Sequence, residues 1–159
     1  PEGNILRSTC AELDLPVIEA APWEVKRSVS SASSGPRVFL PGFRQIEELP
    51  RFYAHACCFV HPAISEPWGL VINEAMACSL PVLCSSNCGA AEELALDGVN
   101  GFTFNPMELS SISDAFHRFL SLDDLSVSSF GKVSRSILGN RCPLSSFGQG
   151  LSAILQQLA

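Results

Sequence analysis

Short apolar runs alternate along the chain with segments whose apolar residues recur at helical spacing. The runs have the length of short buried strands and lie at 15–18, 38–40, 57–60, 81–84 and 101–104. Helical spacing is found over 4–13, 46–56, 69–79, 89–96 and in two or three segments after 108. Such alternation is typical of a parallel sheet with helices on both faces. We therefore expect an α/β fold, a Rossmann-like, three-layer domain with the strand at 58–60 at the centre of its sheet.

Length and composition are those of one globular domain. The 159 residues are 47% hydrophobic and 16% charged, which allows a sizeable core. No run approaches the roughly 18 apolar residues that a transmembrane segment needs. A Ser/Gly-rich stretch at 28–35 separates the first segment from the rest, but we expect a single domain over residues 1–159. Because the chain opens at Pro1 on what looks like the start of a helix, we expect a fragment of a longer protein.

Charge and cysteine usage narrow the possible partners. The net charge is −6 and the ten basic residues are scattered, which argues against nucleic acid. The seven cysteines include no Cys-x-x-Cys pair and no zinc-type spacing, so we expect no metal site. Their odd number indicates a reducing compartment, and we expect a cytoplasmic protein, with the longer protein free or peripheral to a membrane. Cys84 and Cys88 could form a local disulfide, although free thiols among apolar neighbours are favoured.

The loop after the strand at 58–60 carries the features of an anion site. In an open parallel sheet, ligands bind outside the carboxyl ends of the strands, where loops lead into helices. Here the loop reaches Gly69, which permits a close backbone approach. The free N–H groups of Trp68, Gly69, Leu70 and Val71 then point out of a helix N-terminus, where the helix dipole favours negative charge. This arrangement suits a diphosphate.

Glu74 is the sharper indication, because its helix is apolar nearly all round and should be buried. A buried carboxylate needs a specific partner. The two hydroxyls of a ribose would serve, and so would an ion pair with an internal base such as Arg44 or a contact with the helix dipole. From the residues alone these readings remain open.

The neighbouring candidates have equally plausible structural explanations. Glu66 in the loop could be a solvated acid. Two carboxylates could also form the catalytic pair of a glycosidase, but we reject this for Glu66 and Glu74 because Glu74 belongs to a helix that is expected to be buried. Trp68 could stack on a sugar or a base, or fill the core. His61 at the strand end is more often structural. Two further loops also follow strands and could approach the same cleft, at 41–44 and 89–91.

The stretch from 38 to 106 resembles the C-terminal half of retaining glycosyltransferases of the GT-B fold, the group 1 family. The matching parts, in order, are VFLPGF, CFVHPAISEPWGLVINEAMA, PVLCSS, CGAAEEL and DGVNGFTFNP. Within this block, Glu66 and Glu74 with seven residues between them match the family's signature glutamate pair.

The resemblance implies a role for each matching position. Glu74 would hold the ribose of a nucleotide diphosphate sugar, and Glu66 would contact the donor sugar near its reacting carbon, as the catalytic residue. The turn formed by Trp68, Gly69, Leu70 and Val71 would bind the sugar and the distal phosphate. Gly42 and Phe43 would lie beside the base. The family transfers a hexose with retention, without a protein nucleophile or an obligatory metal, so no cofactor is implied beyond the donor.

The chain also differs from the family's pattern, and other functions remain possible alternatives. Ser79 stands where the family usually has Gly, which would alter a helix C-cap. The family's phosphate-binding Arg and Lys, and its N-terminal acceptor-binding domain, lie upstream of Pro1. We therefore expect the isolated chain to be inactive. The alternatives are a non-catalytic nucleotide-sugar-binding domain or relic, and another GT-B enzyme such as an epimerase or a phosphorylase.

Overall fold

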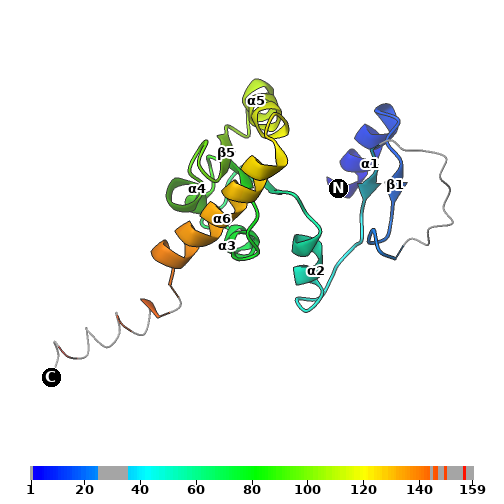
Figure 1. Cartoon of the computed structure of the whole chain (residues 1–159). Coiled ribbons are helices and arrows are strands. Elements are labelled where there is room, and N and C mark those ends of the chain that lie inside the picture. The colour runs from blue at the N-terminus through cyan, green and yellow to red at the C-terminus, as the bar shows by residue number, and fades with distance from the viewer. Residues whose placement is uncertain (1, 25–35, 144, 147–148, 150–155, 157–159) are drawn as a thin grey trace. The chain divides into compact units, whose positions relative to one another are not determined.

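The computed structural model describes residues 2–24, 36–143, 145–146, 149 and 156 (Figure 1). The chain divides into two compact units, Pro1–Leu49 and Pro50–Ala159, and each is considered by itself. The sequence prediction of two or three helices after 108 is confirmed up to residue 141. The expected apolar spacing of Leu151, Ile154, Leu155 and Leu158 and the loop at 28–35 lie outside the described residues.

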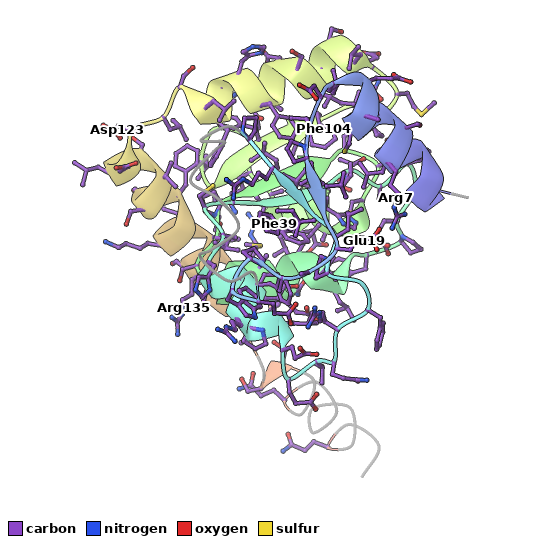
Figure 2. The ribbon with its side chains drawn as sticks, turned by 90° about the vertical axis from the view of Figure 1, so that its right-hand side faces the viewer. Arg7, Glu19, Phe39, Phe104, Asp123 and Arg135 are labelled. Atoms are coloured by element: carbon purple, nitrogen blue, oxygen red, sulfur yellow. The ribbon has the colours of Figure 1, made fainter. Side chains whose placement is uncertain are left out.

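The first unit pairs two very short strands beside one helix. It contains α1 (Glu2–Glu12), β1 (Val17–Ile18) and β2 (Val38–Phe39). The strands are parallel, with Val17 opposite Val38 and Ile18 opposite Phe39. An ion pair of 2.7 Å between Arg7 and Glu19 joins the helix to the segment after β1 (Figure 2).

The second unit alternates strands and helices in the predicted order. Its elements are α2 (Leu49–Ala54, whose first residue belongs to the first unit), β3 (Phe59–His61), α3 (Leu70–Ala77), β4 (Val82–Ser85), α4 (Gly89–Leu94), β5 (Gly101–Phe104), α5 (Leu109–Leu120) and α6 (Asp124–Arg141). The expected α/β class with parallel sheets is confirmed, because β3, β4 and β5 pair in parallel.

The predicted position of the first strand in this sheet is wrong. The order is β3-β4-β5, so among the described residues β4 lies at the centre and β3 lies at an edge. All four residues of β4 are buried, whereas those of β3 are only partly buried. The apolar run 57–60 suggested full burial, but a run of apolar residues cannot distinguish an edge strand from a central one.

Helices cover both faces of the three-stranded sheet, and α6 contributes to both. On one face, Ile72 and Met76 of α3 pack with residues of α4 and with Leu138 of α6. On the other face, Phe119 of α5 packs with Phe102, Phe104 and the first half of α6. Figure 2 shows Phe104 beneath α5, and in Figure 1 α6 runs past α3 and α4. The sheet is therefore enclosed between two apolar layers that share one helix.

The end of α3 explains the unusual Ser79. This residue adopts a left-handed conformation with φ 60° directly after the C-cap Cys78. The N–H of Ser79 donates to the Met76 carbonyl and that of Leu80 to the Ala75 carbonyl, at 3.0 and 3.1 Å. This is a Schellman motif, whose left-handed position is usually glycine. The expected place of Ser79 at a helix C-cap is confirmed, and its effect on the cap stays a prediction.

We expect Ser79→Gly to stabilise the chain by about 1 kcal/mol, because the left-handed conformation costs an L-residue roughly 1–2 kcal/mol. Urea denaturation measures the change. The matched control is Ser136→Gly on the exposed side of α6, which should destabilise the chain by about 0.5 kcal/mol. Equal effects at the two positions would contradict this assignment.

Candidate functional site

The loop between β3 and α3 lies against the loop between β4 and α4, at the carboxyl end of the sheet. The Glu66 N–H donates to the Asn87 carbonyl, and the Glu66 carbonyl accepts from Gly89 N–H at 2.9 Å. The Trp68 carbonyl accepts from Ala90 N–H at 2.8 Å. The predicted place of the Glu66 loop at this edge is confirmed.

Two glycines make this close approach possible. A Cβ at Gly89 would stand 2.1 Å from the Pro67 carbonyl oxygen. Gly69 has φ +92°, and a Cβ there would stand 2.8 Å from Cys88 Sγ. Backbone and thiol therefore occupy the space in which any larger residue would need its side chain. The close approach expected at Gly69 is observed, and Gly89 is a second position with such contacts.

The first turn of α3 presents its backbone N–H groups without a side-chain cap within the described part of the chain. Gly69 is the N-cap residue and supplies no side chain. One step earlier, the Glu66 carboxylate accepts from Trp68 N–H at 3.3 Å. The N–H groups of Leu70 and Val71 begin the helix, where the dipole favours an anion. Both of their side chains are exposed, at 69% and 37%.

Trp68 packs against the core in this structure. Its half-buried ring packs against the cluster that contains Ile72 and Met76. The structure shows the packing against the core, and stacking of the ring on a sugar or a base stays a prediction. The ring anchors the loop, and the backbone of the same residue is held by Ala90.

The predicted burial of Glu74 is wrong. Its side chain is exposed, because α3 buries only the face formed by Ile72, Ala75 and Met76. The apolar Leu70 and Val71 gave the helix a buried appearance in the sequence, yet both face outward.

The partner of Glu74 is Tyr53 of α2, whose hydroxyl donates to the carboxylate at 2.9 Å. The suggested pairing with Arg44 is not what the structure shows. The Arg44 guanidinium instead binds Glu24 at 2.7 Å and Glu48 at 3.2 Å, all within the first unit. Glu74 therefore keeps acceptor capacity for a ligand, because a carboxylate can accept several hydrogen bonds.

A groove of about 770 Å³ opens beside Glu74. It lies between α3 and the end of α6 and is lined by Asn73, Glu74, Ala77, Arg135, Leu138, Gly139, Cys142, Pro143 and Ser145. Arg135 lies on the α6 side (Figure 2). The Oδ1 atom of Asn73 is buried there and has no hydrogen-bond partner among the described residues. Volumes of this size accommodate small ligands.

Glu66 lies in the loop before α3 and Glu74 lies on α3, and Glu66 is not among the residues that line this groove. A single donor site shared by both carboxylates therefore stays a prediction. Gly42 and Phe43 belong to the first unit, where Gly42 has φ +73° and Phe43 is 87% exposed. Their approach to a base also stays a prediction.

Tyr53 and Asn87 are parts of this region that the sequence did not reveal. Asn87 accepts from the Glu66 N–H through its backbone and donates from its side chain to the Ile64 carbonyl at 3.0 Å. Its position directly after a strand could have drawn attention to it. Tyr53 gave only the weak signal of being the one tyrosine in the chain.

The single tyrosine allows a direct test of the Tyr53–Glu74 contact. Burial, followed by the hydrogen bond to Glu74, raises the pKa of Tyr53 above its usual value of 10. Since the folded pKa is raised, this contribution to stability is present below pH 10 and is lost as the pH rises further. We expect absorbance titration of the folded chain to show a delayed tyrosinate transition, which Glu74→Gln moves back toward pH 10. A transition at the ordinary pKa in the parent chain would contradict the contact.

The remaining polar candidates are structural in character. The His61 ring stacks on Phe59 with centroids 6.2 Å apart, and its buried Nε2 atom has no partner among the described residues. All seven cysteines are free thiols, as favoured from the sequence. Burial and then the neighbouring Cys88 raise the pKa of Cys84 to about 12, so that the thiol remains protonated.

Within the described ranges, no cluster of three His, Cys, Asp or Glu side chains is placed to bind a metal ion. None of the described helices has the length and apolar character that crossing a membrane requires.

A family model described as "Glycosyl transferases group 1" matches residues 21–133, which is well over half of the chain. The chain belongs to this family. The matched region of this group 1 chain begins in the first unit and ends within α6.

Individual relatives match over about half of this group 1 chain. The sucrose synthase of Thermosynechococcus vestitus is 37% identical over 78 residues, which are 49% of this chain and 10% of that protein. The O-antigen chain mannosyltransferase B of Escherichia coli is 39% identical over 83 residues, 52% of this chain and 20% of that protein. The chain thus spans only a tenth to a fifth of the length of these relatives.

Solved structures extend the similarity to most of the chain. Sucrose-phosphate synthase of Thermosynechococcus elongatus has a TM-score of 0.66 at 27% identity, over 77% of this chain and 30% of that one. Anabaena HepE in complex with UDP and glucose has a TM-score of 0.62 at 28% identity, over 78% of this chain and 33% of that one. This group 1 chain therefore has the Rossmann-like α/β architecture of GT-B glycosyltransferases.

Proposed function

We propose that the chain supplies the donor-binding half of a retaining hexosyltransferase that uses a nucleotide diphosphate sugar. The observation that carries the proposal is the first turn of α3, where uncapped N–H groups at Leu70 and Val71 lie within two turns of the accessible Glu74 carboxylate. Backbone N–H groups suit a diphosphate, and a carboxylate suits ribose hydroxyls. HepE was solved with UDP, with UDP-glucose, and with UDP and glucose, and this similarity supports the same ligand class here.

Each residue then has a chemical task. Glu74 accepts hydrogen bonds from the ribose, and the turn at Gly69 holds the distal phosphate by backbone donors. Glu66 contacts hydroxyls of the donor sugar near the anomeric carbon. The transition state resembles an oxocarbenium ion, and the departing phosphate helps to deprotonate the acceptor hydroxyl. The proposal includes neither a protein nucleophile nor an obligatory metal.

The rest of the reaction is assigned to parts of the longer protein. Cationic side chains on the diphosphate stabilise the charge that develops on the leaving group. An acceptor-binding domain holds the attacking hydroxyl close to the anomeric carbon, and such positioning is a large share of catalysis. The whole enzyme is proposed to work in the cytoplasm.

The 159-residue chain should bind UDP weakly and transfer no sugar. One helix N-terminus is worth about 0.3–1 kcal/mol to an exposed anion, so we expect a dissociation constant of order 1 mM. NMR titration with UDP should shift the amides of Leu70 and Val71. Incubation with labelled UDP-glucose and candidate acceptors should give no acceptor-dependent product. Robust transfer would mean that the active site has been misplaced, and unshifted amides at roughly 10 mM UDP would contradict donor binding.

Glu74→Gln should weaken UDP binding by about 10-fold or more, because a hydrogen bond to a charged group contributes roughly 1.5–3 kcal/mol. The fold should persist, since the side chain is exposed. Glu93→Gln on the exposed side of α4 is the matched control for the loss of one negative charge. The same UDP affinity in the parent, Glu74→Gln and Glu93→Gln chains would exclude a ribose contact by Glu74.

A further inference from the structure

Tyr53 of α2 meets the carboxylate that the proposed donor site uses, although its own helix contributes nothing to the core. None of the described side chains of α2 is buried. The Tyr53 ring lies edge-on against Phe59 of β3, with centroids 6.0 Å apart and ring planes at 60°. Phe59 in turn packs against the cluster that contains Ile72 and Met76. The ring is therefore fixed from the side of the sheet, and its hydroxyl reaches Glu74 of α3 at 2.9 Å.

The contact restricts the Glu74 carboxylate and leaves most of its acceptor capacity open. An exposed glutamate on a helix has several rotamers, and fixing one of them on binding costs conformational entropy. Here the Oε2 atom accepts from Tyr53, and no hydrogen bond to Oε1 is found among the described residues. A carboxylate has about four acceptor positions. This one is held at a single position, and both of its oxygens can still accept from a ligand.

Tyrosine suits this task because it donates a hydrogen bond without carrying a positive charge. A lysine or an arginine at the same place would form an ion pair and occupy the same oxygens. Burial, followed by the contact with Glu74, raises the pKa of Tyr53 above its ordinary value, so the hydroxyl keeps its proton at neutral pH. The contact thus leaves the charge of the carboxylate uncancelled, and hydrogen bonds to a charged acceptor are stronger than neutral ones.

The order of groups along α3 places a ribose beside this contact. The proposed phosphate donors at Leu70 and Val71 precede Glu74 by roughly one helical turn. A ribose joined to a phosphate at the first turn would therefore lie over the next turn, where Tyr53 holds the carboxylate. Its two hydroxyls are neighbours, and they donate together only to a carboxylate in a suitable orientation.

We propose that Tyr53 is a positioning residue of the donor site, whose hydroxyl holds the Glu74 carboxylate in the orientation that receives both ribose hydroxyls. The site thereby selects ribonucleotides over nucleotides whose sugar lacks these hydroxyls. This inference rests on the proposed function and extends it to a second residue on another helix. Holding the carboxylate before the ligand arrives removes part of the ordering cost of binding. A ligand without the hydroxyls gains nothing from that preparation.

The test compares UDP with 2′,3′-dideoxy-UDP by NMR titration of the 159-residue chain, following the amides of Leu70 and Val71. The parent should prefer UDP by about 10-fold or more, because a hydrogen bond to a charged group contributes at least this factor. Tyr53→Phe keeps the ring against Phe59 and removes only the hydroxyl. It should weaken UDP binding about three- to tenfold, the ordering cost of one side chain, and leave 2′,3′-dideoxy-UDP within about twofold of the parent.

Glu74→Gln supplies the control, because Tyr53 is proposed to act through Glu74. Adding Tyr53→Phe to the Glu74→Gln chain should change the affinity for UDP by less than about twofold. Circular dichroism and urea denaturation establish that each variant is folded. A contact that only fastened α2 to α3 would lower the free energy of unfolding in Tyr53→Phe and leave the ratio of the two ligand affinities unchanged.

Selectivity decides between the two roles of the contact. A reduced preference for UDP in Tyr53→Phe, with no further reduction in the Glu74→Gln chain, supports the positioning role. UDP binding that weakens in Glu74→Gln but not in Tyr53→Phe overturns that role and leaves the proposed function standing. Equal weakening of both ligands by Tyr53→Phe also overturns it, because the residue would then act on the fold. A parent chain whose amides do not respond to UDP contradicts donor binding itself, and the positioning role falls with it.

Discussion

Gly89→Ala is expected to destabilise the chain by about 2–4 kcal/mol and to abolish detectable UDP binding. The added Cβ would stand 2.1 Å from the Pro67 carbonyl oxygen and 3.3 Å from Trp68 Cα. Since backbone atoms cannot rotate away as a side chain can, the loop must separate from α4. That separation breaks the hydrogen bond from Gly89 N–H to Glu66 and displaces the first turn of α3. Urea denaturation and NMR titration with UDP measure the two effects.

Gly139→Ala is the matched control for this substitution. It lies inside α6, and a Cβ there meets no atom within 4 Å among the described residues. Alanine should stabilise this helix by about 0.5–1 kcal/mol, in contrast to the loss of stability expected for Gly89→Ala. If Gly89→Ala were as stable as the parent and bound UDP equally well, the close contact between the two loops would be excluded.

Asn100→Ala is expected to cost about 3–4 kcal/mol of unfolding free energy. Asn100 is fully buried, and its side chain accepts from Leu96 N–H at 2.8 Å. It donates to the Leu94 carbonyl at 3.0 Å and to Ser134 of α6 at 3.2 Å. Alanine leaves these groups buried without partners, and each such group costs roughly 1–3 kcal/mol.

Asn140→Ala, at an exposed position of α6, should change stability by less than about 0.5 kcal/mol. Ser134→Ala should fall between the two, because it removes one partner from the same network. Denaturation curves for the three variants give the order. An Asn100→Ala chain as stable as Asn140→Ala would show that the buried network contributes nothing.

Local patterns predicted most elements of the fold. The strand at 101–104 and the helix from 70 were located within a residue or two, because Gly and Pro bound them in the sequence. The order of the strands in the sheet could not be read in this way. Pairing joins Phe59 to Val82 and Val82 to Gly101, and such long-range contacts leave no periodic trace.

The sequence predicted where in the fold the site lies, but only some of the contacts around it. The place of Glu66 followed from the rule that parallel strands present their carboxyl ends at one edge. The exposure of Glu74 could not be predicted from the sequence. When nearly all residues of a helix are apolar, the sequence does not show which face packs against the core and which faces solvent. Its partner Tyr53 lies 21 residues away on another helix, and only the three-dimensional structure brings these two side chains together.

The parallel pairing of β3, β4 and β5 has a consequence for how the chain folds. Each pair of strands can form only after the intervening helix has closed a loop of about 20 residues, so local hairpins cannot guide the process. Until then the apolar residues of β4, which are fully buried in the end, remain open to other chains. Refolding yield should therefore fall as protein concentration rises, even for variants whose equilibrium stability equals that of the parent.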